Sequence, residues 1–182
     1  MAIDEPNFKV VRAYDAFELR RYEPYLVAET VIDAAAEEAG NKGFRLLAGY
    51  IFGRNKGARK IDMTAPVSQA AAKIAMTAPV SQVAGPKGYV IQFAMPRDWT
   101  LETLPEPLDA GVTLREMPAR KLAVISYSGT WSQERYEEHL KRLRDAMAQM
   151  GLVPLGDPVW ARYDPPWKPW FLRRNEIWLE VD

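Results

Sequence analysis

Apolar and polar residues alternate with a period of two over several stretches of the chain, the pattern of half-buried β-strands. The first of these stretches is broken near Tyr14-Asp15 and at Glu23-Pro24, which predicts two or three strands there. A later stretch is split at Pro118. In the tail a strand, a Pro-rich loop and a last strand follow one another, with Ile177 and Leu179 on one face of the last strand. The predicted strands outside the tail lie in residues 8–32, 61–67, 74–80, 89–96 and 112–128.

Two segments have helical periodicity instead. Phe44, Leu47, Ala48 and Ile51 fall at i, i+3, i+4 and i+7 and form one apolar stripe. Asn41 is a candidate N-cap and Gly53 a candidate C′ residue, and an earlier start within residues 33–40 is left open. The second helix has a longer stripe, made by Tyr136, Leu140, Leu143, Met147 and Met150. Thr130 or Ser132 caps its start, and Gly151 ends it.

A ten-residue segment occurs twice. Residues 60–69 read KIDMTAPVSQ and residues 73–82 read KIAMTAPVSQ, with nine of ten positions identical. Both copies alternate with period two, so we predict one strand copied in tandem and folded back as a hairpin, with residues 70–72 as the connection. Prolines 66 and 79 confine such strands to an edge or a bulge. Of the two, Met63 is expected to line a pocket and Met76 to be structural.

The order strand–strand–helix–strand–strand occurs twice, which predicts an α+β fold. We expect a distorted antiparallel β-barrel built from two pseudo-symmetric halves, each with one helix packed on the sheet. The whole chain, residues 1–182, then forms a single domain, with halves of about 8–96 and 112–182.

Composition excludes several function classes. Lys and Arg total 24, as do Asp and Glu, and zero net charge argues against a general nucleic-acid binder. The absence of cysteine excludes disulfides, thiolate metal sites and a Cys nucleophile. No span of 18 apolar residues and no signal peptide is visible, so a cytoplasmic location without a membrane span is expected.

Specific residues resemble a known family. GFRLLAGYIFGRNKG leads into KIDMTAPV, and the chain continues with MP, LPEPLD and finally YDPPWKPWFLRRNEIW. In this order the segments resemble the SOUL haem-binding protein family over roughly residues 8–180. The resemblance implies a fold related to bacterial gyrase-inhibitor-like effector-binding domains, and non-covalent binding of haem or another tetrapyrrole without covalent catalysis. The chain departs from the family pattern in two ways. It has a second copy of MTAPV, and its sole histidine, His139, lies outside the matched segments.

A tetrapyrrole site needs an apolar or aromatic wall and cations for the propionates. From Ala39 to Ile61 the chain has no acidic residue and six basic ones, which is either a solvated helix face or a propionate site. The candidate propionate partners are Arg45, Lys56 and Lys168. The candidate wall consists of Leu47, Tyr50, Ile51, Ile61, Met63, Tyr163, Trp167 and Trp170, and core packing is the alternative for its aliphatic members.

His139 is the obvious iron ligand by residue type, but its place at the border of an amphipathic helix favours a structural role. We therefore expect apolar contact and propionate pairing to dominate binding. The predicted function is that of a haem buffer or carrier with no enzymatic activity and an unknown protein partner. The alternatives are an effector-binding module or a small-molecule hydrolase in which a buried Glu176 with a raised pKa, or a pocket Tyr, activates water. For Glu176, a salt bridge with Arg173 or Arg174 is the simpler interpretation.

Overall fold

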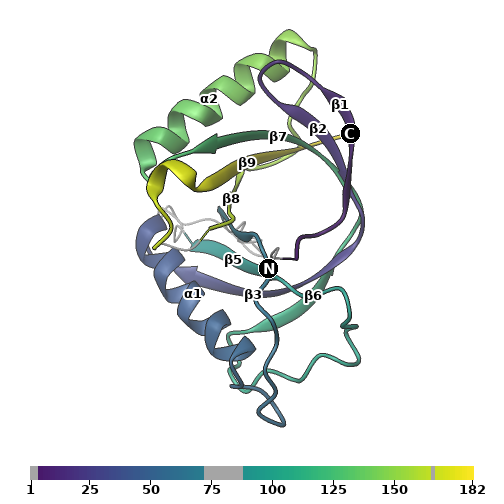
Figure 1. Cartoon of the computed structure of the whole chain (residues 1–182), viewed down its shortest axis with the longest axis vertical. Helices are drawn as coiled ribbons and strands as arrows, with labels where there is room; N and C mark the ends of the chain where they lie inside the picture. Colours follow the sequence, from purple (N-terminus) through teal and green to yellow (C-terminus); the bar gives the residue numbers. More distant parts are fainter. Residues whose placement is uncertain (1–3, 72–87, 165–166) are drawn as a thin grey trace, which may run out of the picture.

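The computed structural model describes residues 4–71, 88–164 and 167–182, and these form one curled antiparallel sheet with two long helices (Figure 1). The strand order is β1-β2-β7-β9-β8-β4-β5-β3-β6, and every neighbouring pair is antiparallel. The predicted α+β class is therefore confirmed. The elements are β1 (Phe8–Ala13), β2 (Glu18–Tyr22), β3 (Tyr25–Asp33), α1 (Ala36–Ile51), β4 (Val67–Ala71), β5 (Gly88–Ala94), β6 (Thr113–Met117), β7 (Arg120–Ser128), α2 (Gln133–Gln149), β8 (Val159–Arg162), the short 3₁₀ helix η1 (Trp170–Leu172) and β9 (Arg174–Val181).

From β2 to β6 the strand order is symmetric about its centre. β7 and β3 each precede a helix, β9 and β5 pair with them, and β8 meets β4 at the middle of the sheet. The halves also exchange strands, because β2 pairs with β7 and β6 pairs with β3. This arrangement confirms the predicted pseudo-symmetric halves with one helix each. β1 and β6 are the ends of the strand order, so the sheet is a half-barrel with two edges.

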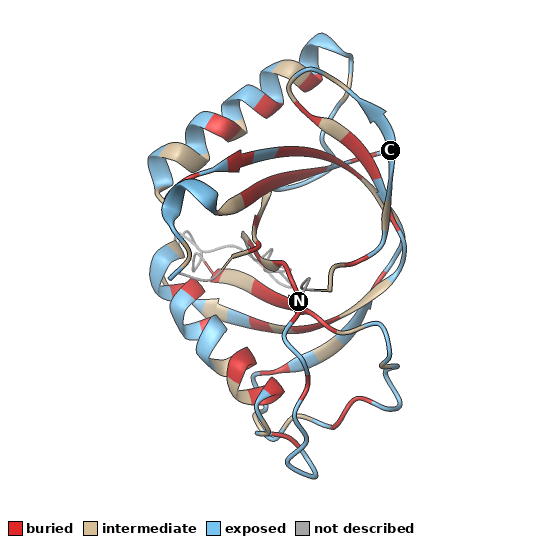
Figure 2. Ribbon diagram, viewed as in Figure 1, coloured by how far each residue is buried: buried red, intermediate tan, exposed pale blue. Residues whose placement is uncertain are grey.

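Both helices pack on the outer side of the curl. α1 covers β3 and β5, and α2 covers β7 and β9. Figure 2 shows the buried residues of each helix as a stripe. Leu47 and Ile51 of α1 pack with Phe93, and Leu143 of α2 packs with Ile177. These two clusters contain most of the buried hydrophobic residues of the described chain, and burial of apolar surface is the main source of stability in such a fold.

The inner side of the curl has its own buried cluster. Because side chains of a strand alternate between its two faces, Ile177 and Leu179 of β9 reach α2 while Glu176 and Trp178 point the other way. Trp178 packs there with Tyr22, their ring centroids 5.4 Å apart. The inner side of the curl thus holds a cluster of aromatic and aliphatic side chains beside one buried carboxylate.

The helix boundaries follow capping chemistry. α2 has Ser132 as its N-cap, which accepts a hydrogen bond from the Arg135 amide, and Gly151 follows its end with φ of 70°. α1 begins at the earlier of the two possible starts, at Ala36, so Asn41 lies inside the helix and is not its cap. Glu37 and Glu38 in the first turn favour this start through the helix dipole. Gly53, with φ of 117°, follows the C-cap as predicted.

The repeated segment differs from the prediction. Residues 60–66 are not a strand, because the Ile61 amide donates to the Ile51 carbonyl (2.8 Å) and the Ala65 amide to that of Asp4 (3.0 Å). β4 instead begins at Val67, after a cis Ala65-Pro66 bond, and Ala70 pairs with Val90 of β5. Residues 70–71 are therefore strand and not the predicted connection. The second copy, with Met76, lies outside the described residues.

Helix α1 approaches β5 very closely at Gly43. A Cβ atom at this position would lie 2.3 Å from Cγ1 of Ile91, a distance that no real contact adopts. At Gly49, by contrast, the nearest atom to such a Cβ would be Cδ of the flexible Arg54 side chain, at 3.1 Å. The glycine at position 43 therefore sets the distance between helix and sheet.

We predict that Gly43→Ala lowers the free energy of unfolding by about 1–3 kcal/mol, because overpacking outweighs the gain in helix propensity. Gly49→Ala is the matched control and should be neutral or slightly stabilising. Urea denaturation of both variants tests this, and equal stabilities would show that Gly43 does not limit the packing of α1.

Candidate functional site

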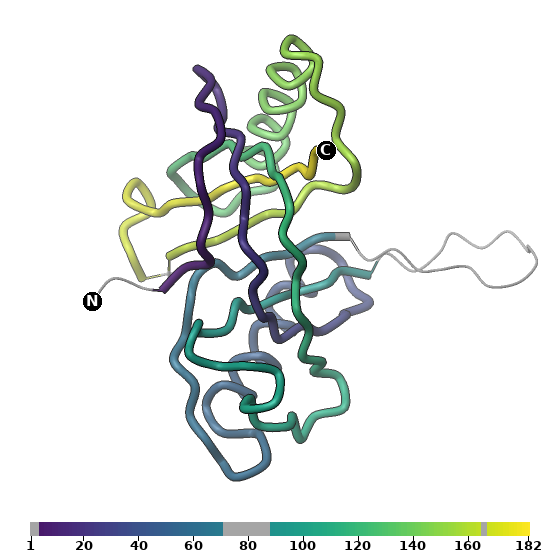
Figure 3. The backbone as a smooth tube through the Cα atoms, turned by 90° about the vertical axis from the view of Figure 1, so that its right-hand side faces the viewer, coloured from purple at the N-terminus to yellow at the C-terminus, as the bar shows by residue number. Residues whose placement is uncertain are grey.

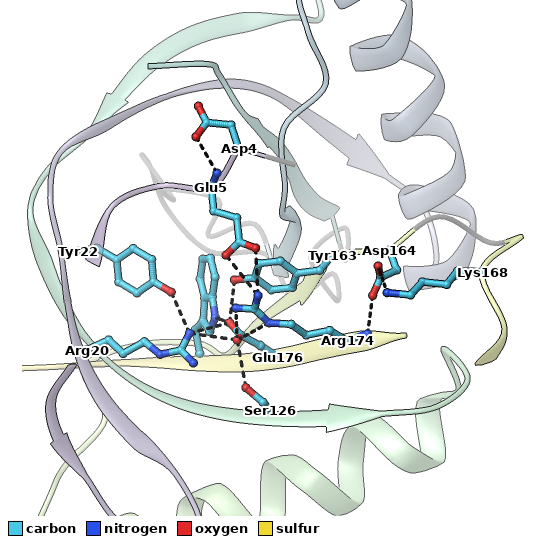
Figure 4. Close-up of polar contacts among 11 residues, drawn as sticks. Asp4, Glu5, Arg20, Tyr22, Ser126, Tyr163, Asp164, Lys168, Arg174 and Glu176 are labelled. Carbon is cyan, nitrogen blue, oxygen red and sulfur yellow. Dashed lines mark hydrogen bonds and ion pairs between the residues drawn. The ribbon is translucent and has the colours of Figure 1, made fainter. Parts of the chain in front are cut away.

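The Glu176 carboxylate lies at the centre of the interior and is fully buried (Figure 4). Both of its oxygens are saturated with hydrogen bonds from β2, β7, β9 and the residue after β8. Oε1 accepts from Arg20 Nη1 (3.0 Å), Ser126 Oγ (3.0 Å) and Arg174 Nη2 (2.8 Å), and Oε2 accepts from Tyr163 Oη (2.8 Å) and Trp178 Nε1 (2.8 Å). Two cations and three neutral donors thus surround one anion.

The ion pairs continue outward as an alternating chain. Arg20 Nε lies 2.7 Å from Glu18 Oε2, and Arg174 Nη1 lies 3.0 Å from Glu5 Oε1. Each guanidinium therefore bridges the buried Glu176 carboxylate and a more exposed one. We call these five residues (Glu5, Glu18, Arg20, Arg174, Glu176) the central ion network. The network joins β2, β9 and the N-terminal segment. Its most distant members, Glu5 and Glu176, are 171 positions apart in the sequence.

The network determines the ionisation of its members. Burial by itself raises the pKa of Glu176, but the attraction of Arg20 and Arg174 and the hydrogen bonds outweigh it, so the pKa lies below its ordinary value. Burial and the nearby Glu176 charge raise the pKa of Tyr22 to about 12. Glu176 is therefore ionised and paired, and the hypothesis that it is a general base with a raised pKa is wrong.

A second feature is the tail loop, which we define as Asp164 and residues 167–173. The Asp164 carboxylate connects the two ends of this loop, because it pairs with Lys168 Nζ (2.6 Å) and accepts a hydrogen bond from the Arg174 amide (2.6 Å). Arg173 Nε donates to the Lys168 carbonyl (2.7 Å). These bonds fix a loop whose side chains point outward.

Large apolar side chains of this loop are exposed, and η1 within it is pale blue in Figure 2. Trp167 is 84% exposed, and Trp170, Phe171 and Leu172 are 56–57% exposed. Trp170 and Phe171 meet edge to face, with centroids 5.7 Å apart. Four such residues within six positions form an apolar surface of the kind that marks interaction sites. Lys168 lies within it, and Arg173 stacks over Trp131 beside it (5.0 Å).

The structure places the predicted wall residues in two environments. The aliphatic and aromatic members near α1 are buried in the core, and the Tyr50 hydroxyl donates to the Pro105 carbonyl (2.8 Å). Met63 is 41% exposed, whereas Tyr163 is buried against Glu176. The core members are Leu47, Tyr50, Ile51 and Ile61. Their contact with a ligand stays a prediction.

The predicted cations do not form one cluster. Arg45 is exposed on α1, and Lys56, five residues beyond α1, pairs with Glu106. Lys168 belongs to the tail loop. The loop after α1 and the tail loop are widely separated in both Figure 1 and Figure 3. A single ligand on the tail loop therefore meets Lys168 and not Lys56.

His139 is buried in the contact between α2 and the sheet. Its ring stacks on Tyr127 with centroids 4.0 Å apart, and Nδ1 lies 2.6 Å from the Arg135 carbonyl. Its fractional exposure is 7%. These contacts give it a packing role within α2. In the described part of the chain no group of three or more His, Cys, Asp or Glu side chains is arranged to hold a metal ion.

The sequence predicted a salt bridge of Glu176 with Arg173 or Arg174, and Arg174 is the one that forms it, but Arg20 was missed. Arg20 and Glu176 are 156 positions apart and meet only because β2 pairs with β7, which pairs with β9. The available signal was the alternation in β2, which places Glu18, Arg20 and Tyr22 on one face. The exposure of Phe171 and Leu172 was also missed, because an apolar run after two prolines does not reveal which way it points.

A model of the SOUL heme-binding protein family matches residues 3–180. The chain belongs to the SOUL heme-binding protein family. Among curated relatives, human Heme-binding protein 2 is 28% identical over 170 residues, which cover 90% of this chain and 77% of that protein. Mouse Heme-binding protein 1 is 28% identical over 150 residues, which cover 82% of this chain and 75% of that protein. The sequence resemblance is thereby confirmed.

Solved structures share the fold of this SOUL protein at low identity. The EcmrR C-terminal domain aligns with a TM-score of 0.64 and 12% identity over 96% of this chain and 98% of that one. A hydrolase from Listeria innocua aligns with a TM-score of 0.60 and 10% identity over 94% of both chains. At this identity the likeness concerns the fold alone. Neither helix of the described chain has the length and apolar character that crossing a bilayer requires.

We predict that Glu176→Gln lowers the free energy of unfolding by about 3–5 kcal/mol, because it leaves Arg20 and Arg174 without their shared buried anion. Glu138→Gln, which removes an exposed carboxylate of α2, is the control and should change stability by less than about 0.5 kcal/mol. Urea denaturation measures both. A loss below about 1 kcal/mol for Glu176→Gln would show that the network contributes little.

The pH dependence provides a second readout of the same prediction. A folded pKa below the unfolded value of about 4.3 means that Glu176 contributes stability above that pH. The contribution is lost as the pH falls through the unfolded and then the folded pKa. The unfolding free energy of the wild type should therefore fall more steeply below about pH 4 than that of Glu176→Gln. Parallel pH profiles would contradict the lowered pKa.

Proposed function

We propose that this SOUL protein binds haem or another tetrapyrrole non-covalently on the surface of the tail loop. Family membership supports a haem ligand in general. The observation that favours this location is the row of exposed apolar side chains from Trp167 to Leu172 beside cations. Since the sequence has no cysteine, it lacks the thiols to which haem is attached covalently in c-type proteins.

A tetrapyrrole is a flat apolar plate, and an aromatic surface matches it. Indole and phenyl rings offer large apolar faces that lose little conformational freedom on binding. Trp167 and Trp170 are the two largest exposed side chains of the loop, and Asp164 holds its ends in place. We therefore infer that ring stacking and burial of these side chains supply most of the affinity.

The propionates need cations at the edge of this surface. Lys168 can pair with a propionate, but the propionate has to compete with Asp164, which already pairs with the Lys168 ammonium group. Arg173 lies beside it and offers a planar donor group. Arg45 remains a proposed partner from the exposed face of α1, and Lys56 is less suited because it pairs with Glu106 at a distance from the loop.

Other sites fit this ligand less well. In the interior, aromatic packing and the central ion network occupy the space around Glu176. A groove of about 470 Å³ is lined by Glu23, Glu102 and Glu116, which repel propionates. The tail loop is thus the better site for a dianionic plate.

Reversible binding at an exposed surface suits a buffer or carrier, because the ligand can leave without opening the fold. An effector-binding module is the second candidate, because the sequence resemblance implies a fold related to effector-binding domains. In that case porphyrin would bind no more tightly than it binds an unrelated protein with exposed tryptophans. Transfer of bound hemin to apomyoglobin tests the carrier role.

The decisive experiment is a titration of the apo protein with hemin and, separately, with iron-free protoporphyrin IX. We expect a Soret shift and tryptophan quenching with both, at affinities within about threefold of each other, because His139, the sole histidine, lies outside the tail loop. The Trp167→Ser/Trp170→Ser double variant should weaken both affinities at least about tenfold.

Phe52→Ser is the matched control, because Phe52 is similarly exposed (63%) but follows α1. It should leave both affinities unchanged, as should His139→Gln in protein shown to be folded. If the tryptophan variant binds like the wild type, the tail loop is not the site. If neither porphyrin binds at micromolar concentration, the proposed function itself is wrong.

A further inference from the structure

A groove with the opposite charge character lies away from the tail loop. It has a volume of about 470 Å³, within the range typical of small-molecule sites. Its walls are the N-terminal residues Pro6 and Asn7, the turn between β2 and β3, residues 95–102, and Glu116 of β6. The Met95 amide donates to the Leu26 carbonyl (2.8 Å), which holds two of these walls together. The groove is therefore built from ordered segments of four regions of the chain.

Carboxylates dominate the charged lining. Glu23, Glu102 and Glu116 are exposed, and neither Glu102 nor Glu116 forms an ion pair with any residue in the described ranges. Arg97 is the basic residue of the lining, and it is already engaged by the Asp4 carboxylate and by Asn7 Oδ1 (2.7 Å). In a chain of zero net charge, this groove has a local negative potential.

The floor of the groove is apolar and aromatic. Met95 is buried, and Tyr25, Leu26 and Trp99 are half-buried. The guanidinium of Arg59 lies 4.6 Å from the centroid of the Trp99 ring, so this ring already binds a cation of the protein itself. An apolar floor with anionic sides is complementary to a molecule that has an aromatic or aliphatic body and a positive head.

We propose that this groove binds a small organic cation, an ammonium or amidinium group attached to an apolar body. The body would rest on Tyr25, Leu26 and Trp99, and the charged head would lie between Glu23 and Glu116. These carboxylates face the groove from adjoining segments, since Glu116 pairs in the sheet with Leu26, three residues after Glu23. Burial of the body favours binding, and the carboxylates select the sign of the charge.

This inference does not rest on the proposed tetrapyrrole site. The groove and the tail loop share no lining residue, and their charges are opposite. A dianionic porphyrin and an organic cation should therefore bind independently. Failure of one proposal leaves the other untouched.

The test uses benzyltrimethylammonium as the probe and phenylmethanesulfonate as its anionic counterpart. Titration followed by ¹H–¹⁵N correlation spectra should shift the amides of Leu26, Trp99 and Leu101 with the cation and not with the sulfonate. Raising the salt concentration should weaken the effect, because exposed charges are screened. Equal shifts of these amides by both ions, or none by the cation at millimolar concentration, would overturn the proposal.

Substitutions locate the site. The Glu23→Gln/Glu116→Gln double variant should weaken binding of the cation by about fivefold or more, as expected for the loss of two exposed charges. The matched control, Glu134→Gln/Glu138→Gln, removes two exposed carboxylates of α2 and should leave the affinity unchanged. Retained affinity in the groove variant, or an equal loss in the control, would show that the cation does not bind between these carboxylates.

Discussion

One buried carboxylate held by two arginines organises the interior of this protein. Glu176 is fully inaccessible, and an unpaired charge in such a place would cost several kcal/mol. Arg20 from β2 and Arg174 from β9 remove this cost only if both strands keep their register, and Glu5 brings the N-terminal segment to the same point. The network therefore couples the pairing of distant segments to the burial of one charge. It also occupies the centre of the curl, which is one reason for placing the proposed ligand site on the surface.

The distribution of charge then separates two surfaces. The chain has no net charge, yet the tail loop combines exposed aromatic rings with Lys168 and Arg173, while the groove beside Trp99 has carboxylates around an apolar floor. Each surface favours a ligand whose charge is opposite to that of the surface. Neither kind of binding requires a metal ligand or a nucleophile from the protein. Recognition by shape and charge is consistent with membership of the SOUL heme-binding protein family.

Local chemistry made much of the fold predictable from the sequence. Pro24 and Pro118 break strands, and Ser132 and Gly151 bound a helix. The alternation of Ile177, Leu179 and Val181 gives the face of β9 that packs on α2. The strand start at Val67 was not predictable, because the partners of Ile61 and Ala65 are remote in sequence. For the same reason the sequence revealed the local Arg174 partner of Glu176 but not Arg20. Periodicity shows that Leu47 and Ile51 are buried, but it does not show whether they face a ligand or other core residues.

The central claim is that the interior stays closed and that a tetrapyrrole binds outside it, on the tail loop. Hydrogen–deuterium exchange of the protein with and without saturating protoporphyrin IX tests this claim most directly. The account predicts added protection confined to residues 167–173 and the adjoining start of β9, with unchanged exchange in β2, β7 and the rest of β9. Protection, or opening, centred on the strands that carry Arg20, Ser126 and Glu176 would contradict it, because the ligand would then enter the interior that the ion network fills.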